Sequence, residues 1–286
     1  MKRFLGINVW LICFAGVGVA EPKAPPVPPA AVVKAWEDAG ANLSWVTGKY
    51  MIELGAPEPA VGKTLEMYFS KVSKTPWDKL PAPKQPFFVK FDSSIENADA
   101  ALKGVASHQG IAGLEVGSTD VSDVGLKHVA GLKNVTRLGL RNTKVTDAGM
   151  KELAGLSKLT WLYLGATRVT DECLQHVAKC QALTHLYLAT PTLGIKDAGL
   201  KHLAGLDKLS VLQLHSLGVT DAGLKHLAGL KNLTTLDLLV LDVTDAGVKH
   251  LTGLTKLTEL SLYAPKVTAA GLKELKTALP KLTITK

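Results

Sequence analysis

The chain has 286 residues, of which 33 are Lys or Arg and 25 are Asp or Glu, so its formal net charge at pH 7 is +8. Aromatic residues make up 6 % of the chain and are not interleaved with the basic positions, which argues against a nucleic-acid-binding protein. A solvated lysine at one helix position of each repeat explains much of the positive charge; the alternative is a nucleic-acid surface.

Residues 1–20 have the pattern of a secretory signal peptide. Lys2 and Arg3 precede an apolar run, and small residues end at Ala20, after which we expect cleavage. The mature protein then starts at Glu21, has a net charge of +6 (+8 less Lys2 and Arg3), and is exported to the periplasm, the cell envelope or the medium. The alternative is an uncleaved anchor, but the run is short for a membrane span. We therefore expect no stable span once the signal is removed.

Residues 21–29 are rich in proline and predict a semi-rigid spacer. Residues 30–86 are predicted to form an N-terminal cap region that begins with a helix at residues 30–38. The apolar residues between 43 and 80 are too few for an independent core, so we expect them to seal the first repeat. The alternative is a separate binding or catalytic module, although no chemical motif stands there. Residues 87–91 are predicted to supply a capping strand.

From residue 87 to residue 286 one unit of 24 to 26 residues recurs about eight times. Each unit carries a Leu-x-Leu segment, whose alternation is typical of a short strand. Thr and Asp follow as a predicted helix N-cap, and then leucines at helical spacing form one apolar stripe. The unit from 197 is preceded by a two-residue insertion around residues 190–194. The repeated aspartates are Asp99, Asp123, Asp147, Asp171, Asp197, Asp221 and Asp245, with Ala269 in the last unit.

Strands joined by crossover helices pair in parallel, and such crossovers are right-handed. The sequence therefore predicts an α/β fold, a right-handed solenoid with a parallel sheet on its concave face and short helices on its convex face. Neither element buries its apolar side alone, so neighbouring repeats must stabilise one another. Residues 279–286 close the chain with a last strand of uncertain register, whose edge is expected to be open to pairing.

The unit resembles leucine-rich repeats, nearest the ribonuclease-inhibitor-like subclass written Leu-x-x-Leu-x-Leu-x-x-Cys-x-x-Ile-Thr-Asp, and its near-identical copies are similar to exported bacterial repeat proteins. The resemblance covers about two-thirds of the chain. It implies a hydrogen-bonded ladder at the Cys or Asn position, here only in the first half. No F-box-like helical module is visible, so a ubiquitin-ligase role is not implied. In this chain the Cys or Asn position of the repeat holds Thr119, Thr143 and Thr167 in the first half, and Leu217, Leu241 and Pro265 later.

Residues that invite a chemical role have simpler interpretations. The histidines that share one helix position are too widely spaced for zinc, because packed helices lie about 8–10 Å apart. We interpret them as surface histidines and the repeated Asp as a helix cap. No catalytic motif, metal site or cofactor site is predicted, and the protein is expected not to be an enzyme. The histidines are His128, His176, His202, His226 and His250, and the lysines Lys127, Lys151, Lys201, Lys225, Lys249 and Lys273.

The two cysteines of the mature chain are Cys173 and Cys180. Seven residues apart on one predicted helix, they would lie about 10 Å apart, too far for an unstrained disulfide. Cys180 replaces a consensus leucine. Both are interpreted as small core thiols.

Outward strand positions differ from repeat to repeat, so the fold does not dictate them. We expect Trp161 beside His185 and Tyr163 beside Tyr187, pointing away from the core, because neighbouring strands lie about 4.8 Å apart. Aromatic residues and arginine are frequent interface anchors. The alternative is that the aromatic rings merely cover neighbouring strands. The candidate binding residues on the concave face are Arg137, Arg141, Trp161, Tyr163, His185, Tyr187, Gln213 and His215.

These patterns favour a non-catalytic, exported scaffold that binds a protein, peptide or glycan on its concave sheet. One alternative is a structural component of the cell envelope that acts through its ends. A second is an envelope hydrolase or lyase with its chemistry in residues 30–86. The sequence does not identify the ligand.

Overall fold

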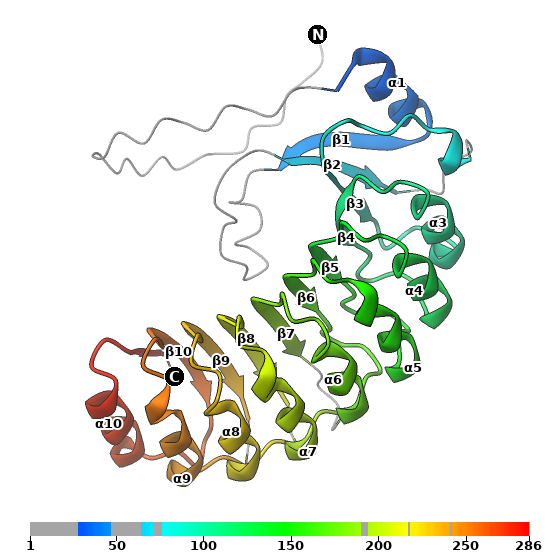
Figure 1. The fold of residues 1–286 in the computed structure, drawn as a ribbon. Helices are drawn as coiled ribbons and strands as arrows, with labels where there is room; N and C mark the ends of the chain where they lie inside the picture. The colour runs from blue at the N-terminus through cyan, green and yellow to red at the C-terminus, as the bar shows by residue number, and fades with distance from the viewer. Residues whose placement is uncertain are drawn as a thin grey trace, which may run out of the picture.

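The computed structural model describes residues 28–46, 64–70, 76–189, 194–216, 218–240 and 242–285. These residues form a curved solenoid whose sheet lines the inner side of the arc and whose helices line the outer side (Figure 1). The predicted α/β repeat solenoid is therefore confirmed. The predicted signal peptide, most of the proline-rich spacer and the insertion at residues 190–193 lie outside the described residues.

One sheet of eleven strands, in chain order, runs through the whole described molecule. β1 and β2 pair antiparallel, and every later pair is parallel. The strands are β1 Ala41–Val46, β2 Thr64–Phe69, β3 Phe87–Phe91, β4 Ile111–Glu115, β5 Arg137–Gly139, β6 Trp161–Tyr163, β7 His185–Ala189, β8 Val211–His215, β9 Thr235–Leu239, β10 Glu259–Tyr263 and β11 Thr283–Thr285.

The helices are short, and in three repeats a 3-10 turn continues the α-helix. Nothing in the local sequence accounts for this difference, because Asp197–Gly205 and Asp221–Gly229 are identical and only the first has the 3-10 turn. The helices are α1 Ala30–Asp38, α3 Ala98–Val105, α4 Asp123–Val129, α5 Asp147–Met150, α6 Asp171–Val177, α7 Asp197–Leu200, α8 Asp221–Leu227, α9 Asp245–Lys249 and α10 Ala269–Ala278; the 3-10 turns are η1 Trp77–Lys79, η2 Lys151–Gly155, η3 Lys201–Gly205 and η4 His250–Gly253.

The repeated Asp is not the helix cap that the sequence predicts. In α5 the cap is Thr146, whose hydroxyl accepts a hydrogen bond from the Ala148 N–H, while Asp147 is the first helical residue. The Asp147 carboxylate instead accepts two hydrogen bonds from Thr170 of the next repeat, from its N–H at 2.8 Å and its hydroxyl at 2.7 Å. The same Asp-to-next-repeat bond starts at Asp99, Asp123, Asp147, Asp171, Asp197, Asp221 and Asp245.

The predicted ladder at Thr119, Thr143 and Thr167 is also wrong. Each of these buried hydroxyls donates to a carbonyl three residues earlier, inside its own repeat. A ladder between repeats exists instead one position before each of the strands β5 to β10, where a Thr or Ser hydroxyl donates to the main chain of the preceding repeat. It runs through both halves of the solenoid, along Thr136, Thr160, Thr184, Ser210, Thr234 and Thr258.

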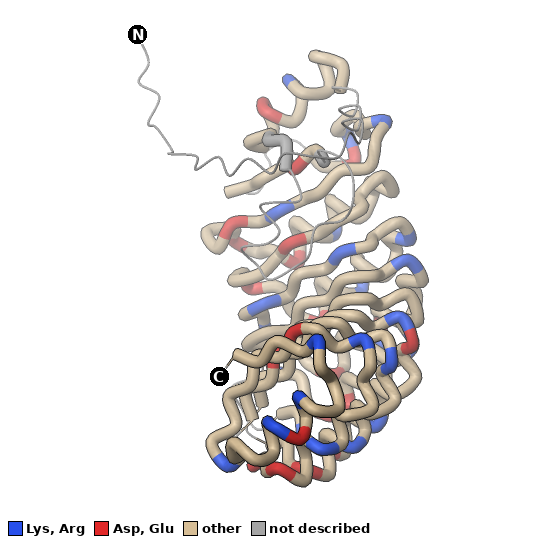
Figure 2. Tube along the Cα trace, turned by 90° about the vertical axis from the view of Figure 1, so that its left-hand side faces the viewer, with Lys and Arg blue, Asp and Glu red and all other residues tan. Residues whose placement is uncertain are grey.

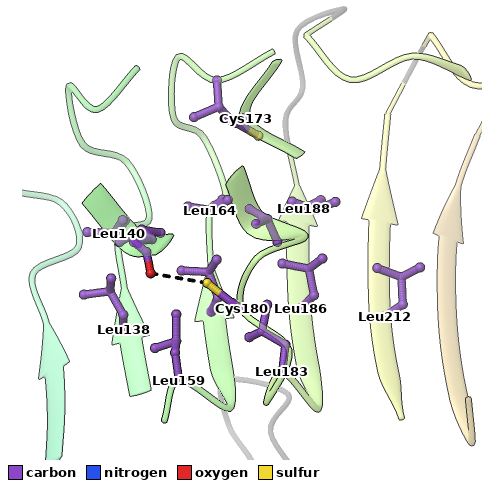
Figure 3. Close-up of a cluster of buried hydrophobic side chains, with 14 of the residues drawn as sticks. Leu138, Leu140, Leu159, Leu164, Cys173, Cys180, Leu183, Leu186, Leu188 and Leu212 are labelled. Atoms are coloured by element: carbon purple, nitrogen blue, oxygen red, sulfur yellow. Dashed lines mark hydrogen bonds between the residues drawn. The ribbon is translucent and has the colours of Figure 1, made fainter. Parts of the chain in front are cut away.

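A single hydrophobic core follows the solenoid from Trp36 to Leu282. Figure 3 shows part of this core, in which leucines of the strands lie beside Leu159 and Leu183 from the turns that precede two strands. Cys173 and Cys180 are free and buried among them, as predicted. They are not on one helix, however, because α6 ends at Val177; the Cys180 thiol lies 3.5 Å from the Leu153 carbonyl oxygen.

Residues before the first repeat belong to the same core. Trp36 on α1 is fully buried, and its ring centroid lies 6.0 Å from those of Phe69, Trp77 and Phe87. Its indole N–H donates to the Pro81 carbonyl at 2.8 Å. The residues at 30–38 form the expected helix, and those at 87–91 the expected strand. The aromatic side chains thus join β2 and β3 to the first repeat.

The outer face carries the repeated lysines, and all six are exposed, as expected of solvated positions. Lys and Arg occur along the whole solenoid with Asp and Glu interspersed (Figure 2). At the far end, β11 pairs with β10 in the register Leu260 to Ile284, and Thr283 and Thr285 are exposed. Within the described residues no helix is long and apolar enough to cross a membrane.

Candidate binding surface

Parallel pairing arranges the outward side chains of the concave sheet in rows across the strands. The register places Arg137, Trp161 and His185 side by side in a first row, which continues through Val211 and Thr235 to Glu259. The second row lies two residues further along each strand. It runs along Glu115, Gly139, Tyr163, Tyr187, Gln213, Asp237 and Ser261.

The predicted neighbours Trp161, Tyr163 and Tyr187 are brought together, and with Val211 they form a cluster that we call the aromatic patch. The Trp161 and Tyr187 ring centroids lie 5.2 Å apart, and those of Tyr163 and Tyr187 lie 5.5 Å apart. Trp161 and Tyr187 lie outside the main hydrophobic core, as predicted, but each is only 3 % exposed, so neither is an ordinary surface residue. These rings pack laterally on the sheet.

Elsewhere in the N-terminal half of the concave face, large side chains lie over glycines of the neighbouring strand. The Phe88 ring lies over Gly113, where an added Cβ would be 2.7 Å from it. The Glu115 carboxylate covers Gly139 in the same way, because an added Cβ would lie 1.8 Å from its Oε2. Phe88 and Glu115 thus each lie over a glycine of the next strand. That half is filled by its own side chains.

Charges lie beside the aromatic patch. The Arg137 guanidinium carbon stands 4.5 Å from the Trp161 ring centroid, a cation–π contact. Burial lowers the pKa of Arg137 to about 10, and the nearby Glu115 opposes that shift. Burial raises the pKa of Glu115, while the Gly117 N–H, which donates to it at 3.2 Å, together with Lys90 and Arg137, favours its charged form. A small cavity of about 40 Å³ lies between these side chains.

His185 and Arg141 border the aromatic patch differently. His185 Nδ1 lies 2.7 Å from the Thr184 hydroxyl, and burial, assisted by Arg137, lowers the pKa of His185 to about 4. It is therefore neutral at neutral pH. Arg141 lies beyond the end of β5 and is exposed, so the structure does not bring it into the patch.

The concave face is open over β8 to β11, where a groove of about 440 Å³ begins at Tyr187. The predicted Gln213 and His215 meet there on the Asp237 carboxylate, which accepts hydrogen bonds from Gln213 Nε2 at 2.7 Å and His215 Nε2 at 2.9 Å. We call this region the C-terminal groove. Its outward-facing lining residues are Tyr187, Val211, Gln213, Thr235, Asp237, Glu259, Ser261, Thr283 and Thr285.

Sequence reasoning gave no weight to Asp237, Glu259 and Ser261. They occupy the same outward strand positions that identified Gln213 and His215, so the signal was present. Aromatic residues and arginine are the more frequent interface anchors, and these three residues belong to neither type. Burial raises the pKa of Asp237, but the hydrogen bonds from His215 and Gln213 outweigh it, so that the net pKa is lowered and the group is ionised.

The histidines of the outer face do not form a metal site. His128, His176, His202, His226 and His250 are half-buried, each on its own repeat. Among the described residues, no three His, Cys, Asp or Glu side chains gather where they could hold a metal ion.

The sequence matches no known family profile and no curated protein. Among solved structures, an internalin C2 from Listeria monocytogenes is 28 % identical to this chain at a TM-score of 0.50, and the match covers 68 % of this chain and 77 % of the internalin. A second internalin of that species, inlF, is 19 % identical at a TM-score of 0.50, with 70 % of this chain and 66 % of that chain covered. These similarities support the leucine-rich repeat fold.

Proposed function

We propose that the chain is an exported, non-catalytic scaffold that binds a partner on its concave sheet, within the C-terminal groove. The observation that carries this proposal is the contrast between the two halves of that sheet. The cavity in the N-terminal half is only about 40 Å³, whereas the C-terminal half leaves about 440 Å³ open above polar side chains that the core does not use. Solenoids commonly bind their partners on such extended concave surfaces.

The candidate residues then have different roles. Gln213 and His215 orient the Asp237 carboxylate at the floor of the groove. Tyr187 forms the end wall, where Trp161 supports it from the neighbouring strand. Tyr163 belongs to the aromatic patch, Arg137 and His185 border it, and Arg141 lies beyond it. All four are outside the groove lining.

Export rests on the predicted signal peptide at residues 1–20. N-terminal sequencing of protein taken from the native host tests it, and we expect a mature start at Glu21. Recovery of a chain that retains Met1 in the cytosol would contradict export.

Filling the groove tests the binding proposal. Ser261 is exposed and projects from β10 into the groove, so Ser261→Trp should fill the groove without disturbing the core. Lys225→Trp on α8 places the same side chain on the outer face and is the matched control. Partners retained from envelope extract by wild type and by Lys225→Trp should be lost by Ser261→Trp. Equal retention by all three proteins would exclude the groove as the binding surface.

A further inference from the structure

The C-terminal groove has a charge opposite to that of the chain as a whole. Its described lining includes two carboxylates, Asp237 and Glu259, and no Lys, Arg or His, although the chain has a net charge of +8. The N-terminal half differs, because there Glu115 has Lys90 and Arg137 near it. The carboxylates of the groove therefore lack a nearby Lys or Arg among the lining residues.

The two carboxylates are placed so that one cation can contact both. Asp237 is on β9 and Glu259 on β10, one strand apart at a spacing of about 4.8 Å and two residues apart along the sheet. Gln213 and His215 fix the Asp237 carboxylate, so little conformational entropy is lost when it contacts a ligand. The Glu259 carboxylate lies 3.3 Å from the Thr235 hydroxyl and is exposed.

An exposed aromatic side chain lies further along β10, outside the groove lining. Tyr263 follows Ser261 by two residues on β10 and is 59 % exposed, which makes it one of the two large hydrophobic residues most open to solvent in the described chain. Tyrosine rings and carboxylates together favour guanidinium and ammonium groups, by cation–π contact and by charge. An exposed tyrosine is also a frequent interface anchor.

We propose that the C-terminal groove binds an extended peptide segment that carries arginine or lysine, with one cationic side chain between Asp237 and Glu259. This inference rests on the proposed function and names the chemistry of its partner. The four strands β8 to β11 span about 14 Å, which is the length of roughly four residues of extended chain. A short segment that crosses the strands therefore fits, and the sheet offers it side chains rather than main-chain pairing.

The test uses the full chain and short fluorescein-labelled peptides in which arginine, glutamine or glutamate alternates with serine. Fluorescence anisotropy should show binding of the arginine peptide, weakened by added salt, and no binding of the other two. Asp237→Asn and Glu259→Gln should each weaken it about tenfold or more. Glu172→Gln, which removes an exposed carboxylate from α6 on the outer face, should leave it unchanged.

Other results would overturn this proposal. Thermal melts should first show that Asp237→Asn, Glu259→Gln and wild type are all folded. If all three then bind the arginine peptide equally, the cationic side chain does not bind between Asp237 and Glu259. Binding of a neutral peptide or glycan that Ser261→Trp abolishes would keep the concave scaffold and reject the cationic partner. Self-association of wild type that Glu259→Gln abolishes would assign the groove to a second copy. If Ser261→Trp blocks the binding of no ligand at all, both proposals are rejected: the groove as the binding surface and the cationic peptide as its partner.

Discussion

The Asp123 carboxylate accepts two hydrogen bonds from Thr146, one from its backbone N–H at 2.8 Å and one from its hydroxyl at 2.7 Å. The two residues are 23 positions apart and belong to consecutive repeats. Thr146 also caps its own helix through the Ala148 N–H. One threonine therefore caps the helix of its own repeat and also hydrogen-bonds to the preceding repeat.

Natural variation within the chain offers a test of this contact. Asp171 meets Lys196 in the next repeat, which offers only a backbone N–H, at 2.7 Å, whereas Asp147 meets both groups of Thr170. Asp147→Ala should cost about 2 kcal/mol of unfolding free energy, and Asp171→Ala about 1 kcal/mol less. Both are the first residue of a helix, so the loss of helix-dipole stabilisation cancels in the comparison. Urea denaturation of both variants measures the difference, and equal costs would refute the role of the hydroxyl.

The aromatic patch should contribute to stability. Trp161 is 3 % exposed and contacts Tyr187 and the Arg137 guanidinium, so Trp161→Ala should destabilise the protein by about 3 kcal/mol or more. Tyr263→Ala removes an aromatic ring that is 59 % exposed on the same face and should cost about 0.5 kcal/mol or less. Thermal and urea melts compare the two variants. Similar small losses of unfolding free energy in both variants would mean that the Trp161 ring does not pack on the sheet and is an ordinary surface side chain.

The strands and helices could be predicted from the sequence because they follow a local pattern. Leu-x-Leu and the leucine stripe recur with one period, and each element needs only its own residues to be recognised. The register followed from the same period, so Trp161 was correctly placed beside His185. Because nearly identical units pair in parallel, few strand registers are possible.

Lateral packing could not be predicted in this way. Whether the Tyr163 ring is exposed depends on Gly165, two residues further along the chain and beyond the end of β6. Gly165 leaves room for the ring, because an added Cβ there would lie 2.5 Å from it. The Asp147 contact likewise depends on a threonine 23 residues away. Such features depend on residues that are neighbours in space. The repeat pattern identifies these neighbours, but it does not give the orientations of their side chains.

His185 should make stability depend on pH. Burial lowers its pKa from 6.5 to about 4, so between these values the unfolded chain binds more protons than the folded one. The free energy of unfolding therefore falls as the pH falls through this window, and His185→Gln should reduce that fall. The buried His108, whose pKa burial also lowers, should leave a residual slope in the variant. Urea melts between these pH values measure the slope of the unfolding free energy against pH for wild type and for His185→Gln. Identical slopes would show that folding does not lower the pKa of His185.

Both cysteines should remain reduced and react slowly in the folded protein. Burial raises the pKa of Cys180 to about 11 and also raises the pKa of Cys173, and the thiolate is the reactive form. Iodoacetamide at neutral pH should therefore label neither in the native protein and both in denaturant without reductant. Mass spectrometry distinguishes these states. A Cys173–Cys180 disulfide would contradict the packing in which each lies separately among leucines.

The aromatic cluster around Trp36 should act as the cap of the first repeats. Trp36→Ala removes a fully buried ring and its hydrogen bond to Pro81, whereas Lys34→Ala on the same helix removes an exposed side chain with a surface ion pair to Asp38. Because each repeat contacts only its neighbours, the Trp36 variant should lose amide protection in β3 and β4 while β8 and β9 stay protected. Hydrogen exchange followed by mass spectrometry resolves these segments, and Lys34→Ala should match wild type. Uniform loss along the solenoid would indicate one cooperative unit, and unchanged protection in β3 would show that the first repeat needs no cap.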